Sequence, residues 1–162
     1  MLIISPSAKI SKLADIEDSV RGSRIVIEDQ VMIDSFVRIK PVGGSGDIRI
    51  GKNTFINSGT VIFSGNGVDI DEWVLIAPNC TIAAANHAYQ SRDTTIRHQG
   101  FLSSKGGIRI ERDVWIGANC VLLDGSWLRE GCVVGAGCVV RDEVEPFSIH
   151  VGNPGRCIGY RR

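Results

Sequence analysis

The sequence predicts an all-β fold: a parallel β-helix solenoid of hexapeptide repeats with one long excursion loop over about residues 86–107. The first observation is an aliphatic residue that recurs every six positions, at Ile110, Ile116, Leu122, Leu128, Val134 and Val140. The second is a small or β-branched residue four places after each of these, at Val114, Cys120, Ser126, Cys132, Cys138 and Val144. The third is the content of 19 glycines, which suits a chain that turns every few residues.

A period of six fits neither the 3.6-residue turn of a helix nor a long run of strand alternation. It fits a short strand followed by a turn, which is the repeat of a parallel β-helix. The aliphatic residue that opens each hexad then fills the interior of the coil. The fifth residue of the hexad is compact because neighbouring walls converge there. Three hexads close one triangular coil of about 18 residues.

The same register runs back towards the N-terminus. It includes Ile10 and Ile16, then Ile27, Ile33 and Ile39, then Ile50, Ile56 and Ile62, and finally Ile70, Ile76 and Ile82. The step between sets exceeds six at residues 42–47 and 64–67, where glycines indicate irregular corners. We expect residues 1–162 to form a single domain, with residues 1–24 as an N-terminal coil or cap and residues 146–162 as a C-terminal cap or tail.

The longest interruption of the register lies between Ile82 and Ile110. This segment is polar, lacks the repeat, and holds His87 and His98, two of the three histidines. A long unpatterned loop in a regular solenoid is usually functional or disordered, and repeat proteins often place such insertions on a binding face. We therefore expect residues 86–107 to form an active-site loop.

Charge and composition exclude several classes of function. The 18 basic and 18 acidic residues cancel, which gives no electrostatic case for binding nucleic acid. No apolar run approaches the roughly 18 residues that span a bilayer, and the N-terminus lacks the pattern of a secretory signal. We therefore expect no membrane insertion and a cytoplasmic location.

Four of the five cysteines occupy the fifth position of a hexad, namely Cys80, Cys120, Cys132 and Cys138. A small apolar side chain belongs at this position, so we interpret these cysteines as buried free thiols in a reducing compartment. None lies in a C-x-x-C pair, and no metal site is predicted.

The ordered motifs around the loop resemble the hexapeptide-repeat acyltransferases over roughly residues 27–160. They are VLIAPN at residues 74–79, NHAY at 86–89, VWIGANCVLL at 114–123, VGAGCVV at 134–140 and VGNPGR at 151–156. The likeness is greatest to the branch that acetylates sugars, which includes maltose, galactoside and polysaccharide O-acetyltransferases. It implies a left-handed β-helix and a homotrimer that binds acetyl-CoA and its acceptor between neighbouring helices.

By this resemblance His87 is the general base. A sugar hydroxyl attacks a thioester poorly until a base that titrates near neutrality, such as an imidazole, removes its proton. The alternative is a loop histidine that only hydrogen-bonds to a corner. Asn57 stands at the position where the sugar-acetylating branch carries an asparagine that contacts the acceptor. Its amide can both donate a hydrogen bond to a hydroxyl and accept one from it. The alternative for Asn57 is an ordinary corner residue.

The resemblance also implies a set of acetyl-CoA-binding residues, namely Trp115, Gly117, Ala118, Ala136, Arg141 and Arg156. In relatives, Trp115 flanks the coenzyme cleft and the backbone amides of Ala118 and Ala136 hold the pantetheine arm. The Ala118 amide is then the candidate oxyanion donor. The two arginines stand where relatives bind the coenzyme, and guanidinium groups bind phosphate in fork geometry.

The resemblance therefore implies an acetyltransferase, of the kind used in polysaccharide biosynthesis, that moves acetyl from acetyl-CoA directly to a carbohydrate hydroxyl, with His87 as base. N-acetylation of an amino sugar, free or nucleotide-linked, is the alternative on the same scaffold. Two readings are remote: a structural hexapeptide-repeat subunit, and a zinc-dependent carbonic anhydrase, for which a third histidine ligand is missing. The acceptor and the role of His98 are left open.

Overall fold

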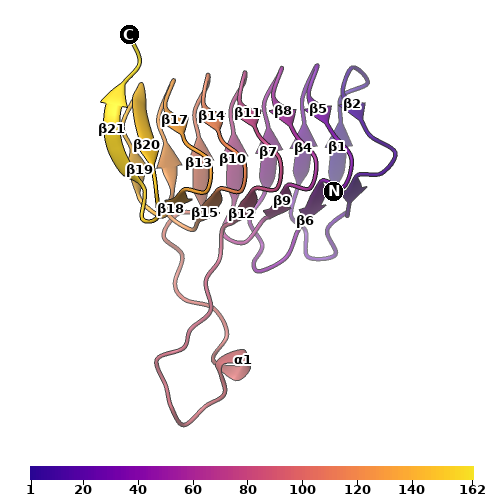
Figure 1. The fold of residues 1–162 in the computed structure, drawn as a ribbon. Coiled ribbons are helices and arrows are strands. Elements are labelled where there is room, and N and C mark those ends of the chain that lie inside the picture. Colours follow the sequence, from indigo (N-terminus) through magenta and orange to yellow (C-terminus); the bar gives the residue numbers. More distant parts are fainter.

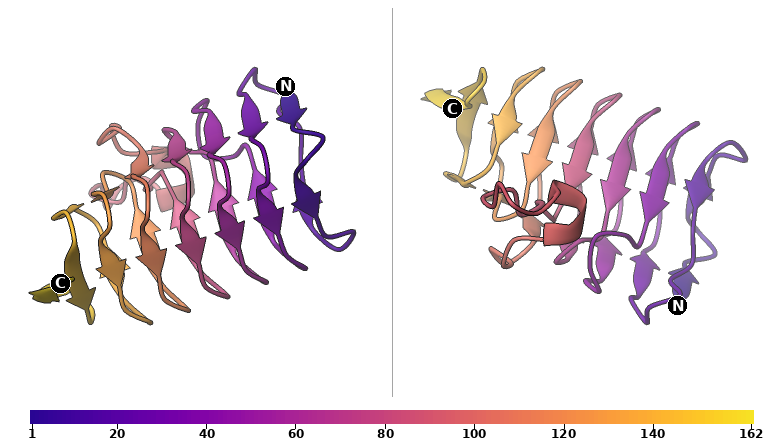
Figure 2. Two further views of the ribbon diagram at one scale, coloured as in Figure 1. Left: turned by 90° about the horizontal axis from the view of Figure 1, so that it is seen from above. Right: turned by 90° about the horizontal axis from the view of Figure 1, so that it is seen from below.

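A computed structural model describes all 162 residues, and the chain is a left-handed parallel β-helix (Figure 1). Twenty-one short strands lie in three sheets that form the faces of a triangular prism. Successive coils lie side by side along one axis from the N-terminal to the C-terminal end (Figure 2). The one helix, α1 (Ile96–Gln99), has four residues, and it is too short to cross a membrane.

Each sheet takes one strand from each of the first six coils, and the last coil adds strands to sheets A and B only. Sheet A contains β1 (Leu2–Ile4), β4 (Ile25–Ile27), β7 (Ile48–Ile50), β10 (Val68–Ile70), β13 (Ile108–Ile110), β16 (Trp127–Leu128) and β19 (Glu143–Val144). Sheet B contains β2 (Lys9–Ile10), β5 (Met32–Ile33), β8 (Phe55–Ile56), β11 (Leu75–Ile76), β14 (Trp115–Ile116), β17 (Val133–Val134), β20 (Ser148–Val151) and β21 (Arg156–Tyr160). Sheet C contains β3 (Asp15–Ile16), β6 (Arg38–Lys40), β9 (Val61–Phe63), β12 (Thr81–Ala83), β15 (Val121–Leu123) and β18 (Val139–Val140).

The inward-facing aliphatic residues stack from coil to coil, as the period of six predicts. Ile76, for example, pairs with Ile56 on one side and with Ile116 on the other, and all three are fully buried. Burial of one such side chain contributes roughly 1.5–3 kcal/mol. In the first coil, Ile10 and Ile16 are only half-buried, because no coil covers them on the N-terminal side. At the other end, β20 and β21 form an antiparallel hairpin at the C-terminal edge of sheet B.

The four cysteines at the fifth position are buried and free, which confirms their interpretation as small interior side chains. Burial raises the pKa of the Cys132 thiol to about 12 and also raises that of Cys138. Both thiols therefore stay protonated and behave as apolar groups.

The chain turns at three kinds of corner in every coil, which we name by the sheets they join. The BC corner holds residues 57–60, 77–80, 117–120 and 135–138 in successive coils. The CA corner holds residues 41–47, 64–67 and 124–126, and also the excursion of residues 84–107 between β12 and β13. This excursion extends away from the prism with α1 near its far end (Figure 1), and it confirms the long loop predicted from the break in the register.

Candidate active site

His87 lies where the excursion leaves the prism, between two antiparallel arms. The nitrogen of Ala88 donates to the Gly100 carbonyl at 3.0 Å, and His87 itself forms an antiparallel bridge with Phe101. The imidazole ring stacks on the Phe101 ring, with centroids 4.6 Å apart and planes tilted by 30°. The backbone and the phenyl ring together therefore fix where this imidazole stands.

One hydrogen bond sets the tautomer of His87. Its Nδ1 lies 3.2 Å from the carbonyl oxygen of Gly100. Because a carbonyl oxygen can only accept, Nδ1 is the protonated nitrogen and Nε2 carries a free lone pair. The side chain is exposed and Nε2 has no partner within the chain. An oriented imidazole with an accessible lone pair can take a proton from an acceptor.

A second group of residues lies at the BC corner. The backbone N–H groups of Ala118 and Ala136, at the same place in consecutive coils, have no acceptor within the chain. The neighbouring Gly117 nitrogen is satisfied by the Val134 carbonyl at 2.7 Å. A Cβ atom on Gly117 would lie 2.5 Å from the nitrogen of Ala136, so glycine is required for the two corners to approach. The corner therefore presents two free donors in a row along the prism.

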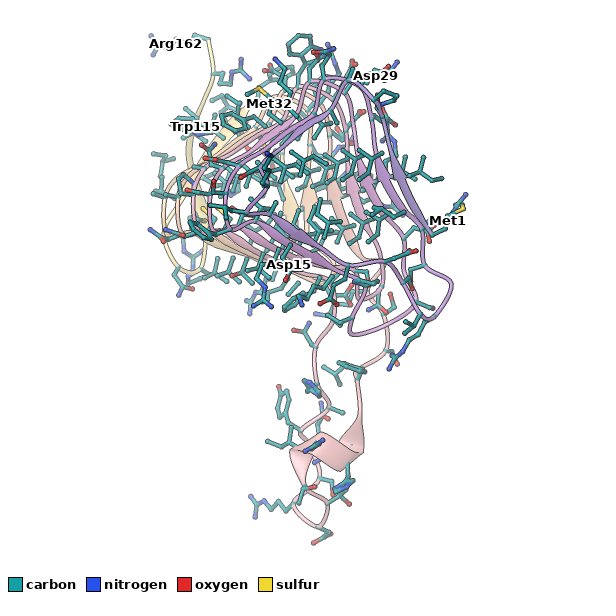
Figure 3. The ribbon with its side chains drawn as sticks, turned by 90° about the vertical axis from the view of Figure 1, so that its right-hand side faces the viewer. Met1, Asp15, Asp29, Met32, Trp115 and Arg162 are labelled. Carbon is teal, nitrogen blue, oxygen red and sulfur yellow. The ribbon has the colours of Figure 1, made fainter.

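Trp115 stands on the outer face of sheet B, next to this corner (Figure 3). It pairs with Leu75 on one side and Val133 on the other, and it is 53% exposed. These side chains, together with Trp73, line a shallow hollow of about 270 Å³. Trp73 itself is 55% exposed at a corner of the prism. Trp127 does pack, because the guanidinium of Arg129 lies 4.2 Å from its ring centroid.

Arg141 and Arg156 line one pocket of about 190 Å³ at the C-terminal end of the prism. His150 lines the same pocket, and its Nε2 is buried without a partner. Burial lowers the pKa of this imidazole, which keeps it neutral near pH 7. Two guanidinium groups and an unpaired imidazole suit an anionic ligand such as a phosphate. Asp142 and Glu143 line the same pocket, and Arg141 pairs with Asp142 at 3.4 Å, so an anion would have to replace this pair. The sequence suggests that His150, in the segment FSIHVGNP, is a packing residue or a neighbour of the coenzyme rather than a catalytic residue.

The remaining polar candidates are already engaged in local hydrogen bonds. One N–H of the Asn57 Nδ2 donates to the Ile76 carbonyl at 2.8 Å, which leaves the second N–H and Oδ1 for a ligand. His98 lies in α1, where its Nδ1 is 2.6 Å from the Thr95 hydroxyl. Arg161, near the C-terminal end of the chain, donates to the Asp113 carboxylate at 2.9 Å.

Within one chain these residues form two separate groups. His87 belongs to the CA corner, whereas Asn57, Ala118 and Ala136 belong to the BC corner, and sheet C lies between the two corners. No hydrogen bond joins residues 86–103 of the excursion to the BC corner. A single chain therefore does not bring the imidazole to the free amides.

Comparison with known proteins places this geometry in context. Residues 107–142 match the family described as bacterial transferase hexapeptide (six repeats). Galactoside O-acetyltransferase of Escherichia coli (strain K12) is 33% identical over 112 residues, which cover 69% of this chain and 53% of that protein. The chain spans only 38% of another curated relative, so it matches part of these longer proteins.

Two solved structures share the fold. The hexapeptide-repeat containing acetyltransferase of Vibrio cholerae, complexed with acetyl-coenzyme A, is 30% identical with a TM-score of 0.72, over 82% of this chain and 69% of that one. A mutant of AntD, an N-acyltransferase from Bacillus cereus, in complex with dTDP-4-amino-4,6-dideoxyglucose and coenzyme A, is 27% identical with a TM-score of 0.82, over 98% of this chain and 83% of that one.

Proposed function

The chain belongs to the hexapeptide-repeat acetyltransferases, and on that premise we propose that it transfers acetyl from acetyl-CoA to a carbohydrate hydroxyl. The observation that carries the proposal is the oriented imidazole of His87, whose Nδ1–H is committed to the Gly100 carbonyl and whose Nε2 is free. Galactoside O-acetyltransferase, one of the matched relatives, takes a hydroxyl acceptor by its name.

The reaction needs one base and one oxyanion donor. Nε2 of His87 takes the proton of the acceptor hydroxyl while the hydroxyl oxygen attacks the thioester carbonyl carbon. The free N–H of Ala118 donates to the negative oxygen that develops on that carbon. The carbon–sulfur bond then breaks, and the imidazolium returns its proton to the departing sulfur. The products are the acetyl ester and coenzyme A, with no acyl-enzyme.

The free donors of the BC corner and the arginines at the C-terminal end of the prism suit successive parts of coenzyme A. An extended pantetheine amide chain can pair with the successive N–H donors of Ala118 and Ala136. The hairpin that carries Arg156 lies one step further on, because the Gly155 nitrogen donates to the Val139 carbonyl at 3.2 Å. Arg141 and Arg156 would then meet the phosphates, and Trp115 would wall the cleft.

A homotrimer, in which one chain supplies His87 and a neighbour supplies the amides, would unite the two groups. The outer face of sheet B supports such an assembly, because a row of apolar side chains in strand register follows it from coil to coil, namely Met32, Phe55, Leu75, Trp115, Val133 and Ile149. Met32 is 43% and Leu75 50% exposed, and exposed apolar rows of this kind mark interaction surfaces. Light scattering is expected to give three times the mass of one chain.

The test of this function is thiol release from acetyl-CoA across a panel of carbohydrate acceptors. Replacing His87 by alanine is expected to lower kcat/KM by about 10²–10⁴-fold, because the general base is lost. The stability of the β-helix should change little, because the side chain is exposed and its contacts, Gly100 and Phe101, lie within the excursion. His98→Ala is the matched control, an exposed histidine in the same excursion, and it should retain activity. If both variants are equally active, His87 is not the base.

N-acylation of an amino sugar is a second candidate, favoured by the match to AntD in complex with an amino-sugar nucleotide. A neutral amine needs less help from a base than a hydroxyl does. An amine acceptor that is acetylated almost as fast by His87→Ala as by the unmodified protein would establish this alternative. A hydroxyl acceptor whose acetylation depends on His87 would rule it out.

A further inference from the structure

The neck of the excursion is held by a buried carboxylate that the proposed chemistry does not use. Asp124, at the CA corner after β15, is 3% exposed. Its Oδ2 accepts the backbone N–H of Lys105 at 2.9 Å, and its Oδ1 accepts the backbone N–H of Gly107 at 2.9 Å. Both donors belong to the arm by which the excursion returns to the prism. No salt bridge involves this carboxylate, and three N–H donors surround it.

The third donor links the other arm of the excursion. The side-chain Nδ2 of Asn66 donates to Oδ2 of Asp124 at 3.0 Å. The backbone N–H of Asn66 donates to the carbonyl of Ala84 at 2.8 Å, in the arm by which the excursion leaves. Asn66 therefore touches the outgoing arm through its backbone and the returning arm through Asp124. The two residues belong to different coils, 58 positions apart in the sequence.

We propose that Asn66 and Asp124 form a clamp that closes the neck of residues 84–107 and so positions His87. From the clamp outward the arms pair with each other, since the Leu102 nitrogen donates to the Asn86 carbonyl at 2.8 Å, one residue from His87. Beyond this pairing no residue from 89 to 98 is buried. Together with the bond from the Gly125 N–H to the Gly107 carbonyl at 2.8 Å, the clamp is therefore the polar attachment that fixes the direction in which the imidazole leaves the prism. This inference rests on the proposed function of His87, but the clamp itself can be tested without activity.

The first test is hydrogen exchange on Asp124→Asn. This change puts an amide N–H₂ where three N–H donors converge, so at least one donor loses its acceptor. The amides of Ala88, Leu102 and Gly107 are expected to exchange faster, while those of β13 to β18 keep their rates. Asp69→Asn is the matched control, since Asp69 is an exposed carboxylate on β10, and it should leave the excursion unchanged. Equal protection of the excursion in both variants would overturn the clamp.

The second test separates positioning from folding. Asp124→Asn is expected to lower kcat by about 10–100-fold and to leave the KM for acetyl-CoA unchanged, because only the orientation of the base is lost. In the His87→Ala background the same change should lower kcat no further. A further loss in that background would show that Asp124 acts through something other than His87. If the unmodified protein acetylates nothing, the proposed function fails, and the exchange experiment still decides on the clamp.

Discussion

In residues 108–144 every sixth residue from Ile110 is buried, and the fifth place of each hexad is buried as well. In residues 85–106 no residue is buried. The two segments adjoin in the chain. Repeated apolar contacts between coils stabilise residues 108–144, whereas a few polar contacts at a narrow neck attach residues 85–106 to the prism.

This contrast explains why the chemistry stands where it does. A stack of rungs gives each coil the same backbone, so the free amides of Ala118 and Ala136 recur at a fixed spacing on a rigid edge. A histidine inside the repeat would be either buried or confined to a face of the prism. The excursion does not follow the repeat, and it holds the imidazole of His87 away from the prism, where it can approach the surface of a neighbouring chain.

The largest expected effect is the loss of stability when a buried side chain of the β-helix is shortened. Leu122 is fully buried in a rung between Ile82 and Val140, so Leu122→Ala is expected to lower the free energy of unfolding by about 2–5 kcal/mol. Leu102→Ala makes the same change in the excursion, at a half-buried side chain, and is expected to cost less than about 1 kcal/mol. Urea unfolding at one protein concentration measures both losses. Similar losses would mean that the excursion contributes to the core.

The repeat could be predicted from the sequence because its cause is local. Ile116 and Cys120 are buried for the same reason as their equivalents one coil away, and six-residue spacing is enough to find them. His87 could be placed at the start of a loop, but its partners Gly100 and Phe101 could not be found, because they lie 13 and 14 positions away in a segment without a pattern. In the sequence Asp124 looks like an ordinary turn residue, because its hydrogen bond to Asn66 forms only when two coils far apart in the sequence stack.

A smaller effect, on activity alone, should follow from Ala118→Pro. The preceding coil already has Pro78 at the equivalent corner position, and the next residue has a positive φ in both coils, Asn79 at 59° and Asn119 at 59°. Proline suits this position of a turn, so the change removes one free N–H and leaves the backbone in place. If that N–H stabilises the oxyanion, kcat is expected to fall by about 10²–10³-fold.

The control for this variant is Ser58→Pro, at the same corner position in the coil before Pro78. It tests whether proline at this corner disturbs the fold, and its activity and melting temperature should both stay near those of the unmodified protein. Full activity of Ala118→Pro would remove the amide from the mechanism. A large drop in melting temperature would mean that the corner needs more than a compatible φ.

The smallest expected effect is the contribution of His150, at the C-terminal end of the prism, to the pH dependence of stability. Burial lowers the pKa of His150, and the charge of Glu145 acts in the opposite direction. The pocket around the imidazole also holds two guanidinium groups and two carboxylates, those of Arg141, Arg156, Asp142 and Glu143. The folded chain then takes up this proton at lower pH than the unfolded chain does, so the contribution to stability is present above about pH 6.5 and is lost as the pH falls below it. The urea midpoint of the unmodified protein should therefore decrease slightly more between pH 7.5 and about pH 5.5 than that of His150→Gln, which cannot titrate. The two proteins differ only at position 150. If their urea midpoints change equally with pH, the C-terminal end of the prism is too open to keep the imidazole neutral.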